Sequence, residues 1–223
     1  MDAGSVSTPE TFVWFDFGGV LSPPLTALFA SYAARTGIPT PVLQQAMATV
    51  GAEYSMPTLA PIELGMIDEH TWVRQIHTVI SREHPGMDLS RSELDFGRQW
   101  FDGHRVNGQV RNFAVELASA GTAVGVLSNN VHEWEPYWRP MVGLDDVATD
   151  FVDSCKVGVR KPDPAIFALA AQRNGVAPDD CLLLDDLAEN CIAAREAGWS
   201  AVQFIDADQA IGEIRALLGD AAA

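Results

Sequence analysis

The chain has 223 residues, of which 48% are hydrophobic, and it carries a formal net charge of -16 at neutral pH. This length and composition predict one globular domain, or one core that carries a subsidiary module. The acidic charge argues against a partner that is nucleic acid or an anionic membrane surface, because both would be repelled. A phosphorylated substrate would also be repelled at long range. An anion site in this chain therefore requires local positive charge, from a cation and a few basic side chains.

The sequence shows no secretory signal and no apolar run long enough to span a bilayer. Its three cysteines, Cys155, Cys181 and Cys191, form no CxxC pair, which favours reduced thiols. We therefore expect a cytoplasmic protein that is a monomer or a homodimer.

The first predicted element is a short apolar strand that ends on a carboxylate. Residues 12–15 are apolar, Asp16 follows them, and Gly18 and Gly19 come shortly afterwards. Such a run is typical of a buried parallel strand, and reactive groups gather beyond the carboxyl ends of these strands. The glycines allow the backbone to approach a ligand that a Cβ atom would exclude. We interpret Asp16 as a nucleophile and a metal ligand, and we expect residues 1–11 to be a frayed start that leads into the strand.

The next part of the chain has helical patterns without strand-like alternation between them. Apolar spacing, a closing glycine, a proline after Thr40 and a capping-box spacing at Ser90–Glu93 mark the ends of these helices. The predicted helices are 25–36, 40–50, 69–80 and 90–101. We interpret residues 22–100 as a small helical module that is inserted after the first strand.

From Val106 the pattern alternates between helices and strands, which predicts a parallel sheet with helices on its faces. The fold class predicted is α/β, a doubly wound parallel sheet with an inserted α-helical cap domain. We expect residues 1–21 and 101–223 to form its catalytic core. The expected strands are 123–127, 150–153, 181–184 and 201–204. The expected helices are 109–120, 164–174, a segment that ends at Gly198, and 208–218.

Three of the predicted strands end on polar residues that would meet at one edge of a parallel sheet. They are Asp16, Ser128 and the pair Asp185–Asp186, and Lys161 lies in a loop between the last two strands. Carboxylates from separate strands can share a divalent cation, and an oxygen-only ligand set suits Mg²⁺. Ser128 and Asn129 can donate hydrogen bonds to phosphate oxygens, and Lys161 can neutralise the encounter between nucleophile and phosphate. This group supplies the local positive charge that the acidic chain otherwise lacks.

These segments together resemble the haloacid dehalogenase-like hydrolases, most of which are phosphatases that act through an aspartyl-phosphate intermediate. The helical insertion is similar to the cap domain that members of the family carry between the first two motifs. The four motifs occur in the family's order, at Phe15–Leu21, Val126–Asn129, Arg160–Pro164 and Asp185–Asn190.

The resemblance implies roles for the matched positions in the hydrolysis of a small phosphorylated metabolite. The catalytic residues would be Asp16 as nucleophile, with Ser128 and Lys161 as the groups that hold the phosphate. Asn190 would orient the acidic loop. The Mg²⁺ ligands would be Asp16, the carbonyl of Gly18, Asp186 and, directly or through water, Asp185. The substrate-binding positions would be Gly18, Gly19, Asn129 and Lys161.

One position departs from the commonest family pattern. Most members carry Asp-x-Asp in the first motif, and the second aspartate protonates the leaving oxygen, whereas this chain has Gly18 there. General acid–base catalysis contributes on the order of a hundred- to ten-thousand-fold to a rate. We therefore expect a preference for good leaving groups, such as anomeric sugar, acyl or aryl phosphates. Ser22, His104 and His132 are the candidates for a replacement acid, and the sequence does not decide between them.

Two other functions stay open from the sequence. A metal-free 2-haloacid dehalogenase uses the same aspartate, but members of that type carry serines where Asp185 and Asp186 stand, which argues against it. A catalytically degenerate relative that binds a phosphate ligand or a protein partner is compatible with Gly18. The aromatic cluster Trp134–Trp138 is interpreted as packing or an interface in preference to a substrate platform.

Overall fold

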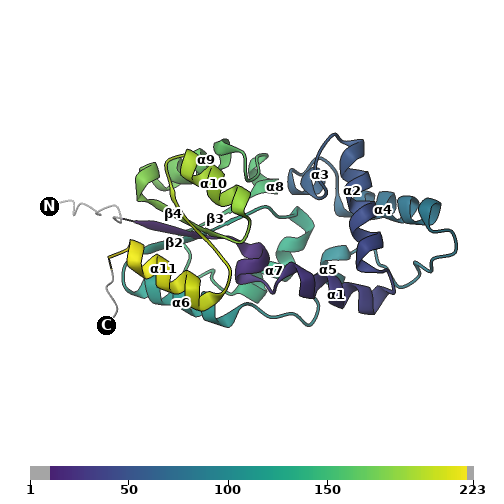
Figure 1. The fold of residues 1–223 in the computed structure, drawn as a ribbon, viewed down its shortest axis with the longest axis horizontal. Helices are drawn as coiled ribbons and strands as arrows, with labels where there is room; N and C mark the ends of the chain where they lie inside the picture. Colours follow the sequence, from purple (N-terminus) through teal and green to yellow (C-terminus); the bar gives the residue numbers. More distant parts are fainter. Residues whose placement is uncertain (1–10, 220–223) are drawn as a thin grey trace.

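The computed structural model describes residues 11–219, and its central element is a five-stranded parallel sheet. The strand order is β3-β2-β1-β4-β5, which places β1 in the middle of a doubly wound sheet (Figure 1). The predicted α/β class is therefore confirmed. Residues 1–10, expected to lead into the first strand, lie outside the described residues. The strands are β1 Phe12–Phe15, β2 Ala123–Ser128, β3 Asp150–Asp153, β4 Cys181–Asp185 and β5 Ser200–Gln203.

Several helices that accompany the sheet begin at a capping side chain. The Asp163 carboxylate accepts a hydrogen bond from the backbone of the helix that it precedes, and Asn107 and Asp206 do the same. These contacts satisfy N–H groups that a helix leaves free at its start. The helices are α6 Gly108–Ser119, α7 Glu135–Val142, α8 Ser154–Val157, α9 Pro164–Asn174, α10 Ala188–Glu196 and α11 Ala207–Leu217, with 3₁₀ turns η2 His132–Trp134 and η3 Pro178–Asp180.

Both faces of the sheet are covered by helices, and this explains why its central strands are continuously apolar. Val13 and Phe15 belong to a hydrophobic cluster that includes side chains of α6 and α11. Phe12 and Trp14 belong to a second cluster, with side chains of α9 and α10. Figure 1 shows these two pairs of helices on opposite sides of the strands. The alternation follows from the two-residue period of a β-strand.

Between β1 and α6 the described chain forms turns and helices, which lie beside the sheet on the right of Figure 1. The interior of this segment is aromatic: the ring centroid of Phe96 lies 5.2 Å from those of Trp72 and Trp100. The segment coincides with the helical module expected for residues 22–100, whose status as a separate domain stays a prediction. Its elements are a turn η1 Phe17–Leu21, then α1 Leu25–Thr36, α2 Thr40–Glu53, α3 Ala60–Glu63, α4 Glu69–Glu83 and α5 Phe96–Phe101.

One helix start differs from the expectation based on the capping-box spacing. The helix expected to begin at Ser90 begins at Phe96. The polar groups of the expected cap have partners outside it, because the Ser92 hydroxyl contacts the Tyr32 hydroxyl at 2.9 Å and the Glu93 N–H donates to a glutamine side chain of α5. Tertiary hydrogen bonds therefore replace the local ones that a capping box would form.

The sheet and the helical segment share a hydrophobic core. The ring of Phe17, directly after β1, lies 5.7 Å from that of Phe101 in α5 and 5.1 Å from that of Trp138 in α7. A buried polar contact joins the same parts, since the Glu69 carboxylate of α4 accepts a hydrogen bond from Trp134 Nε1 at 2.6 Å. Both tryptophans of the aromatic cluster therefore serve in packing.

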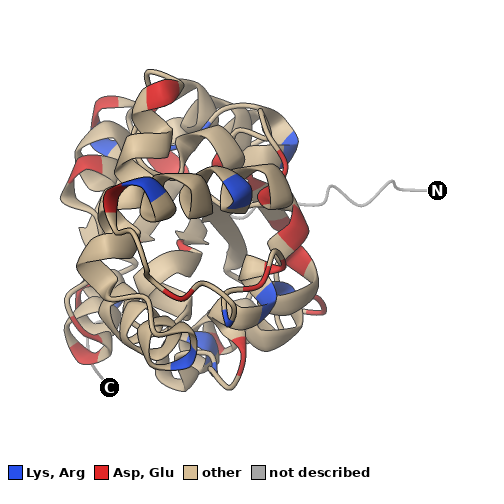
Figure 2. Ribbon diagram, turned by 90° about the vertical axis from the view of Figure 1, so that its right-hand side faces the viewer, with Lys and Arg blue, Asp and Glu red and all other residues tan. Residues whose placement is uncertain are grey.

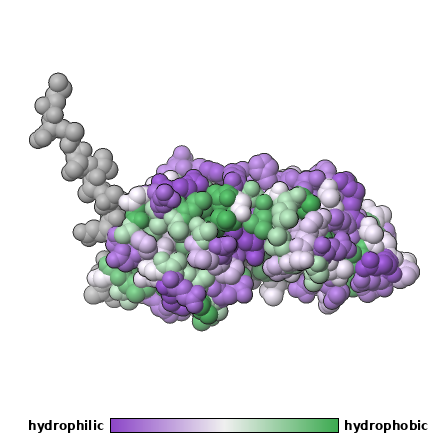
Figure 3. Space-filling model, turned by 90° about the horizontal axis from the view of Figure 1, so that it is seen from above, coloured by the Kyte–Doolittle hydropathy of each residue, from purple (hydrophilic) through white to green (hydrophobic). Residues whose placement is uncertain are grey.

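Acidic, basic and apolar residues are mixed on the surface of the described residues. Figure 2, a view of the helical end, shows acidic and basic residues interspersed along the helices. Figure 3 shows apolar surface next to hydrophilic surface on the face seen from above. Within residues 11–219, no helix is both long enough and apolar enough to cross a bilayer. The exposed large hydrophobic residues are Leu25, Met66, Leu94, Leu187, Ile192, Ile205 and Leu217.

Candidate active site

The carboxyl ends of three strands bring predicted site residues to one edge of the sheet. Asp16 directly follows β1, Ser128 is the last residue of β2, and Asp185 is the last residue of β4, with Asp186 next to it. The strands pair in parallel, so these ends point the same way. The strand order reverses between β1 and β4, and open α/β sheets bind ligands at such a point.

Lys161 reaches this edge from the loop before α9 and is its positive centre. Its Nζ donates hydrogen bonds to Asp16 Oδ1 at 2.8 Å, to Asp185 Oδ2 at 2.5 Å and to the Leu127 carbonyl at 2.8 Å. These three acceptors use all the protons of the ammonium group. Burial lowers the pKa of Lys161, but the two carboxylates raise it, and the net direction is upward. The amine is therefore held in its charged form.

Asn129 fixes the backbone of Lys161. Its Nδ2 donates to the Lys161 carbonyl at 2.8 Å, and its Oδ1 accepts from the Lys161 N–H at 2.8 Å. The amide that the sequence assigned to the phosphate is thus used to position the lysine. Ser128 is buried, with its Oγ 3.5 Å from Asn130 Nδ2. Asn129 and Asn130 both border the cavity described below, and Ser128 does not.

Three carboxylates form the acidic part of the site. Asp16, Asp185 and Asp186 each offer an oxygen within 4.8 Å of the others. Asp185 is fully buried, and its Oδ1 accepts hydrogen bonds from the Leu187 N–H and from Asn190 Nδ2, both at 2.9 Å. Asn190 therefore orients Asp185. The Oδ1 of Asn190 is buried and has no hydrogen-bond partner among the described residues, so an acceptor is free at the edge of the cavity.

The charges of this cluster are not balanced within the protein. Burial raises the pKa of Asp16 to about 8, although Lys161 lowers it, and the charge of Asp185 raises it further. Burial and the charge of Asp185 also raise the pKa of Asp186 to about 6. One ammonium group thus faces three carboxylates, and an all-oxygen donor set of this kind suits Mg²⁺. The residues present fit a divalent cation, which would offset the excess negative charge.

The two glycines after Asp16 have different structural consequences. Gly19 has a φ of 76°, and a Cβ atom there would lie 2.5 Å from Asp186 Oδ2. Only glycine allows the turn to approach Asp186 so closely. At Gly18, where φ is -67°, the nearest atom to an added Cβ would be Asp16 Oδ2, at 3.8 Å. A side chain at residue 18 would therefore have room beside the nucleophile.

The structure separates the three candidates for a replacement acid. Ser22 borders the cavity, but its hydroxyl donates to the Pro23 carbonyl at 2.9 Å and accepts from the Gly19 N–H at 2.9 Å. His104 belongs to a separate surface hollow, and burial lowers its pKa. His132 does not border the cavity. Ser22 alone of the three has access to the nucleophile, and its proton already has an acceptor.

A cavity of about 160 Å³ lies over the strand ends. We call its charged side the polar floor, which consists of Asp16, Lys161, Asp186 and Asn190. We call its opposite side the apolar wall, which is contributed by α1, α2 and α5 and includes Leu28, Phe29, Met47, Phe96, Trp100 and Phe101. The cavity thus combines reactive groups at one end with hydrophobic surface at the other.

An ion pair that the sequence did not predict also borders this cavity. Arg160 Nε donates to Glu63 Oε2 at 2.8 Å. Burial raises the pKa of Glu63, and the charge of Arg160 lowers it. Arg160 adjoins Lys161 in the third motif, but Glu63 lies in α3, a short helix that no sequence pattern indicated. A contact between residues so distant in the chain left no local signal.

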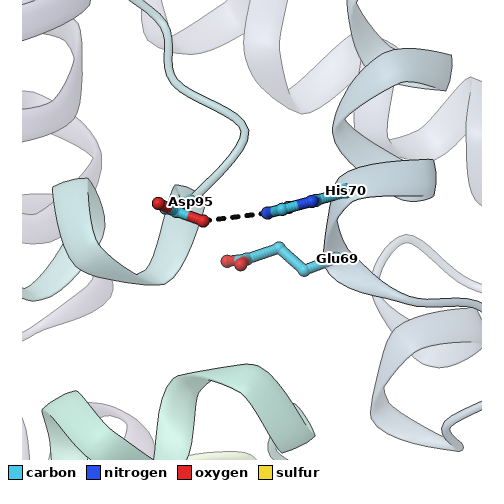
Figure 4. A group of neighbouring side chains, drawn as sticks. All are labelled: Glu69, His70 and Asp95. Carbon is cyan, nitrogen blue, oxygen red and sulfur yellow. Dashed lines mark hydrogen bonds and ion pairs between the residues drawn. The ribbon is translucent and has the colours of Figure 1, made fainter.

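A second group of ionisable side chains, Glu69, His70 and Asp95, lies between α4 and the start of α5 (Figure 4). His70 Nε2 and Asp95 Oδ1 are 2.8 Å apart and exposed. Glu69 is buried, and its Oε1 already accepts hydrogen bonds from Trp134 and from the Gly97 N–H. This group therefore connects α4 to the start of α5, and its buried carboxylate already accepts hydrogen bonds from the protein.

The family model for haloacid dehalogenase-like hydrolases matches residues 12–198. The match includes all four of the motifs quoted above, with the nucleophile position, the lysine and the acidic pair. This chain therefore belongs to the haloacid dehalogenase-like hydrolases.

Individual relatives are more distant. Acyl-CoA dehydrogenase family member 10 of Mus musculus is 26% identical over 220 residues, which cover 93% of this chain and 19% of the mouse protein. Glyceraldehyde 3-phosphate phosphatase of Methanothermobacter thermautotrophicus is 32% identical over 91 residues, which cover 40% of this chain and 39% of that protein. The chain thus spans less than half the length of both relatives.

A solved structure shares the fold. It is an enzyme of the same family from Bacteroides thetaiotaomicron, in complex with magnesium and inorganic phosphate, with a TM-score of 0.60 and 19% identity. The match covers 86% of this chain and 93% of the other. At this identity the likeness establishes the fold alone.

Proposed function

We propose that this chain is a Mg²⁺-dependent phosphatase that hydrolyses small phosphate monoesters through an aspartyl-phosphate on Asp16. One observation carries the proposal: Asp16 lies beside a buried ammonium group and two further carboxylates, on the polar floor of a cavity. A nucleophile, a cation that neutralises phosphate and a set of oxygen ligands therefore meet in one place.

The protein groups would act in two steps. Asp16 attacks phosphorus in line, the bond between phosphorus and the ester oxygen breaks, and the leaving group departs as an oxyanion that takes its proton from water. Water then attacks the acyl phosphate, which releases inorganic phosphate and restores the carboxylate. Lys161, 2.8 Å from Asp16 Oδ1, would stabilise the negative charge on the phosphoryl oxygens. The backbone at Gly18, Gly19 and Asn129 would complete the phosphate site. The hydroxyl of Ser128, which is buried next to Asn130 and outside the cavity, would join it by turning towards the phosphate.

Asp185 and Asp186 would bind the cation in different ways. Bound Mg²⁺ would supply Lewis-acid stabilisation of the phosphoryl oxygens. Asp185 already accepts three hydrogen bonds on its two oxygens, from Lys161, Leu187 and Asn190, and would act through water. The direct ligands would be Asp16, Asp186 and the carbonyl of Gly18.

The substrate would be a small phosphorylated metabolite with a good leaving group. One relative is named as a phosphatase of glyceraldehyde 3-phosphate, and the Bacteroides enzyme was solved with magnesium and inorganic phosphate, which supports phosphate chemistry. Gly18 provides no acid for the leaving oxygen, so esters that depart without protonation are favoured. Sugar 1-phosphates, acyl phosphates and aryl phosphates belong to this class.

The helical segment, residues 22–100, would act as a cap on the core formed by residues 1–21 and 101–223. It contributes the apolar wall of the cavity, and its closure would exclude bulk water from the polar floor. The buried contact between Glu69 of α4 and Trp134 would hold the closed position.

Phosphate release from a panel of monoesters, measured with and without Mg²⁺, tests the proposal. We expect turnover with Mg²⁺, loss of turnover on chelation, and recovery when Mg²⁺ is restored. Aryl phosphates should be hydrolysed faster than primary alkyl phosphates. The matched control is Asp16→Asn, which keeps the size of the side chain and should lower kcat by roughly 10³-fold or more.

Three results would contradict parts of this proposal. Release of halide from a 2-haloacid in the presence of chelator, without phosphate release, would indicate the dehalogenase type. Tight binding of phosphate without turnover of any monoester would indicate a degenerate relative. Equal rates for aryl and alkyl phosphates would remove the preference for good leaving groups.

A further inference from the structure

The apolar wall offers little to a polar leaving group. All the residues that α1, α2 and α5 contribute to the cavity are hydrophobic, among them Met47 and Trp100. Trp134 also borders the cavity, but its indole N–H is already donated to Glu69 at 2.6 Å. A leaving group that extends from Asp16 towards the helices therefore meets mostly hydrocarbon and aromatic surface.

Two of the polar side chains near this wall already have partners within the protein. Arg160 Nε donates to Glu63 Oε2 at 2.8 Å, and the Ser22 hydroxyl donates to the Pro23 carbonyl. A sugar in the cavity would carry several hydroxyl groups out of water, and those that face α1, α2 and α5 would have no partner there. Each unpaired hydroxyl costs on the order of tenfold in affinity. Polyhydroxylated leaving groups are therefore disfavoured.

The volume of the cavity limits the apolar group that it can accept. It is about 160 Å³, and an apolar protein cavity of roughly 150 Å³ binds benzene. The phosphoryl group would occupy the end next to Asp16. The remaining space therefore suits at most a single ring or a branched chain of about six carbon atoms.

We propose that the substrate of this enzyme is the phosphate monoester of a small phenol or of another small apolar hydroxyl compound that is a good leaving group. Its hydrocarbon part would lie against α1, α2 and α5, while its phosphate lies on the polar floor. This inference rests on the proposed phosphatase function and narrows it, because it favours aryl phosphates over sugar 1-phosphates among the esters with good leaving groups. The wall, and not the chemistry of the floor, sets this preference.

A matched pair of substrates separates the effect of the wall from that of the leaving group. Cyclohexylmethyl phosphate and glucose 6-phosphate are both primary alkyl esters with a six-membered ring, and they differ mainly in ring polarity. We expect kcat/KM to be at least about tenfold higher for the cyclohexylmethyl ester. A ratio near or below one would overturn the proposal. Dodecyl phosphate, whose chain exceeds the cavity, should be hydrolysed more slowly, and an equal or faster rate would overturn the size limit.

Substitutions on the wall should change this ratio without removing the chemistry. Met47→Gln keeps the length of a buried wall side chain and adds an amide, so it should lower the ratio at least about threefold. Met87→Gln makes the same exchange at a partly buried position outside the cavity and should leave the ratio unchanged. Leu25→Gln provides a second variant that is safe for folding, because Leu25 borders the cavity and is 42% exposed. If Met47→Gln and Leu25→Gln both kept the wild-type ratio of the two kcat/KM values, the wall would not determine substrate preference.

A binding measurement keeps the inference testable if no ester is hydrolysed. Titration calorimetry of the wild-type protein with Mg²⁺ would compare cyclohexylmethylphosphonate with methylphosphonate. These ligands share the phosphonate and differ in the group that would enter the cavity. We expect the larger ligand to bind at least about tenfold more tightly. Absence of phosphate release would then count against the proposed function alone, whereas equal affinities would count against the apolar site.

Discussion

The polar floor and the apolar wall of the cavity are built in opposite ways. On the floor, directional contacts join Lys161 to its neighbours: its Nζ has three acceptors within 2.8 Å. On the wall, side chains such as Met47 and Trp100 pack through hydrocarbon surface. Removing a floor group leaves a buried charge without its partner, whereas one apolar side chain can replace another at small cost. The proposed chemistry therefore belongs to the floor, and wall residues should tolerate apolar exchanges.

The largest effect on stability and activity is expected from Lys161→Met, which removes the positive charge of the polar floor. This substitution keeps the length of the side chain, removes its charge, and leaves Asp16 and Asp185 buried without compensation. We expect a loss of about 3–5 kcal/mol in the free energy of unfolding at neutral pH, together with loss of phosphatase activity. Denaturant titration followed by circular dichroism measures the first, and phosphate release the second.

Asp16→Asn is the control for that prediction. It removes one negative charge and keeps an oxygen that can accept from Lys161, which still pairs with Asp185. The free energy of unfolding should be unchanged or higher, although activity is lost. If Lys161→Met were as stable as the wild type, the ammonium group would not be what balances the floor.

The next largest effect is expected at Gly18, where the floor meets the rest of the cavity. Gly18→Asp would place a carboxyl group beside the nucleophile, and the space around residue 18 admits its Cβ atom. If the missing acid limits hydrolysis of poor leaving groups, kcat for primary alkyl phosphates should rise by on the order of a hundredfold. The rate for aryl phosphates should change much less, because aryl oxides leave without protonation.

Gly18→Asn distinguishes proton donation by the new side chain from the effect of its size. The amide has nearly the same size as the carboxyl group and cannot protonate the leaving oxygen, so alkyl phosphates should gain nothing from it. A similar increase in both variants would show that the side chain acts by positioning. No increase in Gly18→Asp would show that another group already supplies the proton.

The smallest effect is expected at Asp153, a buried carboxylate at the end of β3 that forms no ion pair with any other described residue. It is 3% exposed, and within residues 11–219 its Oδ2 has no hydrogen-bond partner. Burial raises its pKa from 3.8 to about 6, against a smaller lowering by a hydrogen bond from Cys155. The folded state therefore binds this proton more tightly than the unfolded state does. Stability falls as pH rises from about 4 to 6, and the penalty is fully present above that window.

Asp153→Asn should remove this penalty. Above about pH 7 the variant should be more stable than the wild type by roughly 1–3 kcal/mol, and the difference should shrink towards pH 4. Parallel denaturation series at several pH values measure this difference. A difference that does not change with pH would mean that Asp153 does not titrate in the proposed window. A comparison with Lys161→Met then shows how much a buried ammonium group changes the free-energy cost of burying a carboxylate.

Much of the sheet, and the position of the reactive groups at its edge, could be predicted from the order of the strands along the sequence. Each strand that the sequence predicts is present, and the polar residue at the end of a strand, such as Asp16 or Asp185, lies at the edge of the sheet. This works because strand direction and end are local properties, and parallel pairing then brings the ends together. The sequence predicts that Gly18 and Gly19 allow the backbone to approach a ligand, whereas the close approach of Gly19 to Asp186 is visible only in three dimensions.

The features of the site and of the fold that the sequence did not predict depend on contacts between residues far apart in the chain. The role of Asn129 in holding the Lys161 backbone, the pair formed by Glu63 and Arg160, and the start of α5 at Phe96 were decided by partners from other segments. The local sequence thus determined which groups are reactive and the strand ends from which they project. Tertiary packing alone decided what surrounds them, because a cavity wall is assembled from side chains whose spacing along the chain carries no record of their neighbours.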